Sequence, residues 1–138
     1  MADRACWRIL DANFNRLREG LRVLEEIERL GRDNAALSGR LKRLRHEVSD
    51  CESLLPLKKR LEARDSRGDV GRPFHAGLEG GRKGLAGLAA ANFKRCQEAA
   101  RVLEEFIKLF SPAAAGRMKK IRFKLYDFEK DYSFHQGY

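Results

Sequence analysis

The sequence predicts an all-α protein, a four-helix bundle built from one helical hairpin that occurs twice. Residues 11–30 recur as residues 90–109 with eleven of twenty positions identical, and residues 36–45 recur as residues 113–122 with five of ten identical. Apolar residues in both copies return at spacings of three and four, which is typical of a helix with one buried face. The 138 residues suit one domain of ordinary size, so we expect a single domain over 1–138.

The first copy is expected to span about residues 8–55. Its first helix has a glycine directly after its last apolar position, Gly31 after Leu30, which is typical of a helix end. A second helix is predicted from about Ser38 to Leu55 and must end before Pro56. The buried stripe of the first helix consists of Leu10, Phe14, Leu17, Leu21 and Leu24.

The second copy is expected to span about residues 85–131. A third helix is predicted over 85–110, and Ser111 followed by Pro112 supplies a capping residue and a first-turn proline for the fourth. Helices of this length are marginal alone in water, so their apolar stripes must pack against one another. Four helices related by an internal twofold give a small bundle.

Between the two copies lies a long segment, about residues 56–84, that we expect to be a functional loop. It contains the run RDSRGDVG at 64–71, in which Asp65 and Asp69 are separated by four positions and accompanied by Gly68 and Gly71. Two carboxylates beside glycines suit a Mg²⁺ ion held by one or two acids and by substrate phosphates. The alternative is an ordinary Asp/Gly turn.

A polar stripe recurs on the same sector of both long repeated helices, next to the apolar face. Two interpretations of this recurrence are equally good. Either both stripes line one cavity, or they form buried ion pairs that fix the helix register. The stripes consist of Asn13, Arg16, Glu19, Gly20 and Val23 in the first helix, and of Asn92, Arg95, Glu98, Ala99 and Val102 in the third.

The formal net charge of +9 indicates anionic partners. Basic residues are dense in the second and fourth helices, which keeps a nucleic-acid-binding module as an alternative. However, aromatic residues do not alternate with the basic ones as a base-stacking surface would require. His46, which follows Arg45, is open to three interpretations: an acid or base, a phosphate donor, or an ordinary helix residue.

Several classes of protein are disfavoured. The first residues lack the apolar core of a signal peptide, and no apolar run approaches the roughly 18 residues of a membrane span. Three widely spaced cysteines argue against a disulfide framework and favour the cytoplasm. The sequence contains neither a P-loop, nor a dinucleotide-binding glycine motif, nor a zinc-ligand spacing.

Four motifs in one order give the chain a family resemblance. They are DANFNRLREGLRVLEE at 11–26, Arg45-His46, ARDSRGDVG at 63–71, and ANFKRCQEAARVLEE at 91–105. The chain resembles the small hydroxymethylpyrimidine-phosphate kinases of bacterial thiamine biosynthesis, which occur alone or fused to thiamine-phosphate synthase. The similarity runs from about Arg8 to Tyr126.

The resemblance implies transfer of the γ-phosphate of ATP to 4-amino-2-methyl-5-hydroxymethylpyrimidine phosphate, with ATP and Mg²⁺ as cofactors. Phosphoryl transfer needs positioning and positive charge more than covalent chemistry, which agrees with grooves rich in arginine and carboxylate. The alternatives are the nucleic-acid-binding module and a non-catalytic partner of thiamine-phosphate synthase; the oligomeric state stays open, and a membrane partner is not expected.

The expected site divides by role. Catalytic residues are Arg16, Glu19, Arg95, Glu98 and Asp65, and the metal ligands are Asp65 and Asp69. Arginine is expected to hold phosphate oxygens in pairs, and glycine to let the backbone approach them. The substrate- and phosphate-binding residues are Asn13, Asn92, Arg45, His46, Arg64, Gly68 and Gly71.

Overall fold

A computed structural model describes residues 4–73 and 81–136, with side chains to residue 132, and every regular element in those ranges is a helix. The all-α prediction is therefore confirmed. The elements are α1 (Arg4–Glu26) continued by one π-helical turn (Ile27–Gly31), α2 (Ala35–Glu52), α3 (Leu57–Ala63), α4 (Gly84–Ile107) and α5 (Pro112–Gln136).

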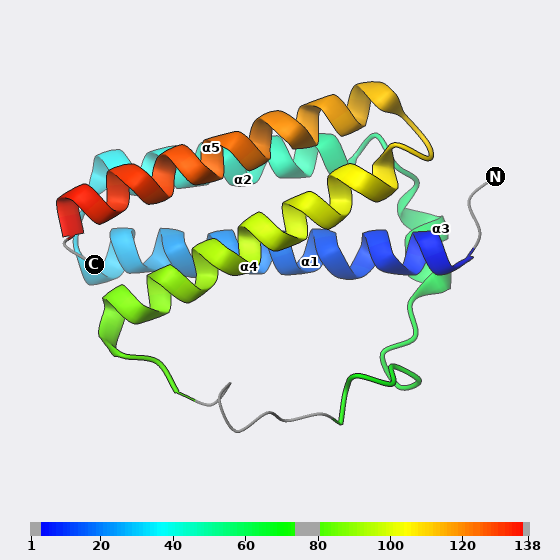
Figure 1. Ribbon diagram of the computed structural model, residues 1–138, viewed down its shortest axis with the longest axis horizontal. Coiled ribbons are helices and arrows are strands. Elements are labelled where there is room, and N and C mark those ends of the chain that lie inside the picture. The colour runs from blue at the N-terminus through cyan, green and yellow to red at the C-terminus, as the bar shows by residue number, and fades with distance from the viewer. Residues whose placement is uncertain (1–3, 74–80, 137–138) are drawn as a thin grey trace.

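The four long helices form two hairpins that pack on each other (Figure 1). Helix α2 packs on α1, α5 packs on α4, and the hairpins meet where α1 contacts α4 and α2 contacts α5. Helices α1 and α4 run antiparallel and cross near their middles. This arrangement places equivalent elements of the two repeats around a common centre, as the internal repeat predicts.

The core is made from equivalent positions of the two copies. Phe14 and its equivalent Phe93 are fully buried, as are Leu24 and Leu103. The same holds in the second hairpin helices, where Leu41 and Met118 are fully buried. Burying each such side chain stabilises the fold by about 1.5–3 kcal/mol relative to exposure. One hydrophobic pattern used twice therefore supplies both halves of one core.

Gly20 allows α1 and α4 to approach closely at their crossing. A Cβ atom at this position would lie 2.6 Å from Sγ of Cys96, which is nearer than side chains pack. The thiol of Cys96 in turn lies 3.8 Å from the carbonyl oxygen of Leu17. The glycine is thus required by packing against α4.

The segment predicted as a loop begins with a helix instead. Helix α3 covers residues 57–63, directly after Pro56, and packs on α1 through Arg60 and Ala63, which are buried. The run LKKRLEA contains good helix formers and no glycine, and this composition could have predicted the helix. Residues 74–80 of the predicted loop lie outside the described residues.

Helix boundaries follow their caps. Helix α2 starts before the predicted Ser38 because the Asn34 side chain accepts a hydrogen bond from the Leu37 amide at 3.0 Å. The Ser111 hydroxyl caps α5 as predicted, accepting a hydrogen bond from the amide of Ala114 at 3.1 Å. No helix within the described ranges is long and apolar enough to cross a membrane.

Candidate functional site

The two polar stripes line one cavity between α1 and α4. Its volume is about 560 Å³, which lies within the ordinary range for small-ligand sites. We call this cavity the groove. The groove is lined by Asn13, Arg16, Glu19, Gly20 and Val23 from α1, and by Asn92, Arg95, Glu98, Ala99 and Val102 from α4. The structure thus brings together the ten residues that share one sector of the two repeated helices.

The two asparagines in the groove are fixed in the same way. The side-chain nitrogen of Asn13 donates to the carbonyl oxygen of Ile9 at 2.9 Å, and that of Asn92 donates to Leu88 at 2.9 Å. Each bond joins a residue to the preceding helical turn, so each carboxamide is held with its own carbonyl oxygen left as an acceptor. Both side chains are buried, at 5% and 8% exposure. The repeat therefore builds two positioned acceptors into the groove.

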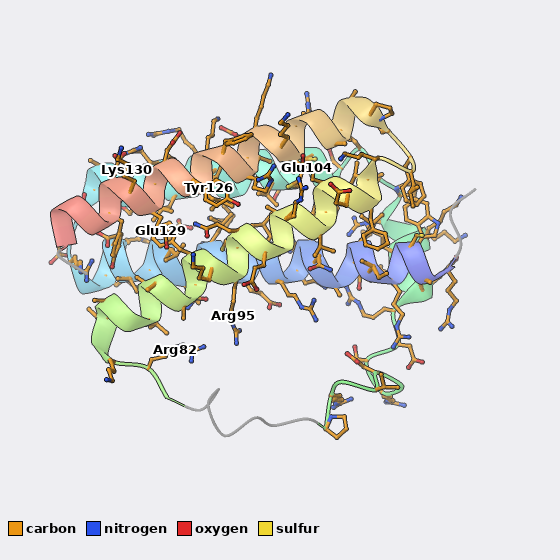
Figure 2. The ribbon with its side chains drawn as sticks, in the orientation of Figure 1. Arg82, Arg95, Glu104, Tyr126, Glu129 and Lys130 are labelled. Atoms are coloured by element: carbon orange, nitrogen blue, oxygen red, sulfur yellow. The ribbon has the colours of Figure 1, made fainter. Side chains whose placement is uncertain are left out.

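The charged residues of the groove are exposed and do not pair with one another. Within the part of the chain that the structure describes, Glu19, Arg95 and Glu98 form no ion pair, and Arg16 makes only a long hydrogen bond of 3.4 Å to Oδ1 of Asn13. Figure 2 shows Arg95 projecting from α4 on the side opposite α5. The register-lock interpretation of these stripes is therefore wrong, and their charges are available to a ligand.

Both signs of charge line the groove from each helix. Arg16 and Glu19 come from α1, and Arg95 and Glu98 come from α4. A ligand that carries both an anionic group and hydrogen-bond donors can satisfy both kinds of side chain at once. The groove thus favours a mixed ligand such as a phosphorylated amine.

Cys96 lies beside Gly20, a residue of the groove, but does not itself line the groove. Cys96 is fully buried, and this burial raises the pKa of its thiol to about 12. It therefore stays protonated at neutral pH and is a poor nucleophile. No histidine lines the groove among the described residues. The groove residues are suited to binding and positioning.

Arg45 and His46 do not belong to the groove. The guanidinium of Arg45 is bound by Glu25, with Nε 2.8 Å from Oε2 and Nη2 3.4 Å from Oε1. His46 is exposed on α2. Arg45 is held in an ion pair that joins α2 to α1, because the buried carboxylate of Glu25 needs a cation, and its phosphate contact stays a prediction.

Arg64 likewise forms an ion pair within the protein. Its Nε and Nη2 atoms donate to the two carboxylate oxygens of Asp11 at 2.6 and 2.8 Å. Asp11 is buried at 2% exposure, so this bidentate pair ties the end of α3 to α1. Asp11 has no acidic equivalent in the second repeat, where Ala90 stands. This difference between the repeats could have indicated that Asp11 has a partner of its own.

The two loop aspartates form turns. Oδ1 of Asp65 accepts from the Gly68 amide at 2.8 Å, and Oδ1 of Asp69 accepts from the Gly71 amide at 2.8 Å. No three metal-ligating side chains come together in the described ranges. One oxygen of each carboxylate remains outside these turns, so the pair suits a Mg²⁺ ion only if phosphates supply the other ligands. Their role as metal ligands stays a prediction.

Part of the positive charge of α2 and α5 is paired with acidic residues of the protein. Lys124 on α5 pairs with Glu47 on α2 at 2.8 Å, and Arg40 pairs with Asp131 at 3.1 Å. Arg122 pairs with Glu104 at 2.7 Å, and Figure 2 shows Glu104 on the side of α4 that faces α5. These pairs leave less free positive charge for a phosphate backbone than the composition indicates.

A comparison with known proteins assigns the chain to a family. The model of the ThiD2 family matches residues 8–131. The chain belongs to the ThiD2 family. No solved structure matches it.

Similar curated proteins carry the name thiamine-phosphate synthase. The chain is 41% identical over 130 residues to that of Nostoc punctiforme, which covers 94% of this chain and 36% of the relative. It is 40% identical over 123 residues to that of Thermosynechococcus vestitus, covering 89% and 34%, and 37% identical to that of Rhodopirellula baltica, covering 89% and 33%. The chain thus spans about a third of the length of the curated relatives that it matches.

These names correct the assignment of the chain as a hydroxymethylpyrimidine-phosphate kinase. Relatives at about 40% identity over most of this chain are named for the synthesis of thiamine phosphate and not for a kinase. The coarser assignment to thiamine biosynthesis is supported by the family and the relatives. The link to thiamine-phosphate synthase is supported with it.

A second cavity, which the helical wheels did not predict, continues from the groove. It has a volume of about 490 Å³ and shares Glu19 and Val23 with the groove. Its other wall comes from Leu85 and Leu88 at the start of α4. The sequence signal for it is the pair Leu85 and Leu88, which lies two turns and one turn before Asn92 and precedes the repeated segment.

Proposed function

We propose that this ThiD2-family chain binds a phosphorylated pyrimidine in the groove and acts as a non-catalytic partner of thiamine-phosphate synthase. The observation that carries the proposal is the match of nearly the whole helical unit to about a third of proteins with that name. The match covers about a third of each of those relatives. A helical unit that accompanies a synthase and holds a ligand groove is suited to capture a substrate or an intermediate.

The chemistry of the groove supports a phosphorylated aminopyrimidine. Arg16 and Arg95 each present a guanidinium that binds phosphate oxygens in pairs. Glu19 and Glu98 accept hydrogen bonds from an exocyclic amine, and the fixed carbonyl oxygens of the asparagines add acceptors. Asp65 and Asp69 do not line the groove, and their role as carboxylate ligands of a Mg²⁺ ion is a separate proposal.

Isothermal titration calorimetry tests the binding step. The ligand is 4-amino-2-methyl-5-hydroxymethylpyrimidine phosphate, and the unphosphorylated alcohol is the control; ATP and Mg²⁺ are titrated separately. We expect one phosphorylated ligand per chain, with Arg16→Gln and Arg95→Gln each weakening binding about tenfold or more through loss of a charge-assisted contact. Arg43→Gln, a change on exposed α2 surface outside the groove, is the matched control.

The partnership with the synthase has its own readout. Adding the chain to a thiamine-phosphate synthase at limiting pyrimidine substrate should lower the apparent KM, and the Arg95→Gln variant should not. Two results would contradict the proposal: equal affinity of wild type and arginine variants for the phosphorylated pyrimidine, or ATP turnover by the chain that depends on the pyrimidine.

A further inference from the structure

We propose that the second cavity is a ring-binding subsite, which takes the heteroaromatic ring of a ligand whose phosphate lies among the groove arginines. The inference rests on the proposed function and adds to it the orientation of the ligand. The subsite is lined by Val23, Ile27, Leu85 and Leu88 with Gly31, and by the charged residues Glu19, Arg22 and Glu26. It adjoins the groove, with which it shares Glu19 and Val23.

The apolar part of the subsite's wall consists of aliphatic side chains from two helices. Val23 and Ile27 come from α1 and its π-helical end, and Leu85 and Leu88 come from the first turns of α4. Leu85 is 44% exposed, so its apolar surface is only partly covered by the fold. Gly31 adds no side chain, and its Cβ position would lie 3.4 Å from Cδ1 of Leu85. The glycine therefore lets the end of the π-helical turn lie close against Leu85, and the ring would bind beside this contact, on the apolar surface of Leu85.

The opposite end of the groove is closed, although the repeat makes the two ends equivalent. Counting along the repeat, the equivalent of Gly31 is Phe110, and the equivalent of Ile27 is Phe106. Phe110 packs against Trp7 with ring centroids 4.3 Å apart, and Trp7 is only 9% exposed. Aromatic side chains of the protein therefore occupy at one end the kind of space that stays open at the other.

This asymmetry selects one ligand orientation. Arg16 and Arg95 are symmetric and would hold a phosphate equally in either direction. The apolar subsite lies beside Glu19 and beyond Asn92, so a ring extending from the phosphate can be buried only toward the start of α4. There the ring contacts aliphatic carbon while its amine reaches the Glu19 carboxylate. The expected ligand class is an amino-substituted heteroaromatic phosphate, whose ring binds in the subsite while its phosphate binds in the groove.

The repeat itself suggests the decisive variant. Gly31→Phe places at the open end the side chain that its equivalent, Phe110, provides at the closed end. Leu85→Ser removes apolar surface from an exposed first-turn position of α4. Gly116→Phe, at an exposed α5 position with nothing near its Cβ, and Leu109→Ser, at a leucine 63% exposed, are the matched controls outside both cavities.

Calorimetry on the full chain compares the phosphorylated aminopyrimidine with inorganic pyrophosphate, which has no ring. We expect Gly31→Phe to weaken pyrimidine binding at least tenfold and Leu85→Ser to weaken it roughly three- to tenfold through lost apolar contact. Both variants should change pyrophosphate binding less than twofold, whereas Arg95→Gln weakens both ligands. Circular dichroism confirms that each variant is folded.

The outcomes separate this inference from the proposed function. Loss of pyrimidine binding in Arg95→Gln with wild-type binding in Gly31→Phe and Leu85→Ser overturns the subsite and leaves the groove standing. Equal losses for pyrimidine and pyrophosphate in the leucine and glycine variants also overturn it. Failure of the wild type to bind the pyrimidine overturns both. A dimer that dissociates in Leu85→Ser, seen by light scattering, shows that the cavity is an interface between copies and overturns the ring assignment.

Discussion

Nε of Arg45 lies 2.8 Å from Oε2 of Glu25, and the same contact recurs in the second half of the chain between Arg122 and Glu104 at 2.7 Å. Each pair joins the two helices of one hairpin, α1 to α2 and α4 to α5. The carboxylates are buried in both copies, at 3% and 4% exposure. These buried ion pairs fix the helix register within each hairpin, whereas the charged side chains that α1 and α4 contribute to the groove are left without ion pairs among the described residues.

Glu104→Gln should destabilise the protein at neutral pH by about 1–3 kcal/mol, because the buried carboxylate receives a charge-assisted bond from Arg122. Burial alone would raise the pKa of Glu104, but the bond from Arg122 and the neighbouring cations outweigh it, so this pKa is lowered on folding. The stabilisation is thus present above the ordinary value near 4.5 and is lost as the pH falls through the lower folded value.

Urea unfolding at pH 7 and at about pH 3 measures this difference. Glu105→Gln is the matched control, because Glu105 is the next residue and its ion pairs are exposed; it should cost less than about 0.5 kcal/mol. A gap between wild type and Glu104→Gln that widens toward acid would contradict the assignment.

Gly20→Ala should reveal the close approach of α1 to α4. The added Cβ would lie 2.6 Å from the Cys96 thiol in a fully buried site, and such overpacking costs about 1–3 kcal/mol, of which helix propensity restores up to about 1. In a Cys96→Ala background the obstacle is gone, and Gly20→Ala should be neutral or stabilising. Additive effects in this double-mutant cycle, measured by urea unfolding, would show that Cys96 is not what the new methyl group meets.

Thiol reactivity should distinguish the three cysteines. Burial raises the pKa of Cys51 to about 11 and that of Cys96 to about 12, so both stay protonated at pH 8 and are shielded from reagents. Cys6 is partly exposed. Ellman's reagent should therefore titrate one thiol quickly in the folded chain and three in denaturant. Rapid modification of Cys96 in the native state would mean that the α1–α4 contact opens readily.

Asp65→Asn and Asp69→Asn should leave stability nearly unchanged while removing any Mg²⁺-dependent part of phosphate binding. Asparagine still accepts the bonds from the Gly68 and Gly71 amides, so the turns persist. Only the negative charge on the oxygens outside the turns is lost. Calorimetry with and without Mg²⁺ measures the effect, and a Mg²⁺ response that is the same in the double variant would remove both aspartates from the metal site.

Much of the fold and of the groove could be predicted because the same sequence pattern occurs twice in the chain. The common wheel sector of Asn13, Arg16 and Glu19 in one copy and of their equivalents in the other indicated a shared environment before any geometry was known. The partners of Arg45 and Arg64 could not be predicted in this way. A helical period tells which face a side chain is on, but not which carboxylate of another helix lies opposite.

The ring-binding subsite could not be predicted for a related reason. It depends on Gly31 meeting Leu85, 54 positions apart, at the end of the groove where the repeat is broken. The equivalents of these residues are Phe110 and Cys6, and Phe110 instead packs against Trp7. Internal repetition predicts what the two halves share, and function here depends also on where they differ.

Two-dimensional ¹⁵N NMR during titration with the phosphorylated aminopyrimidine tests the groove most directly. The account predicts saturable shifts of the side-chain amide signals of Asn13 and Asn92 and of the backbone amides of Gly20 and Ala99, with α2 and α5 surface positions unchanged. Shifts confined to the basic surfaces of α2 and α5, with both asparagine side chains unaffected at saturation, would contradict it.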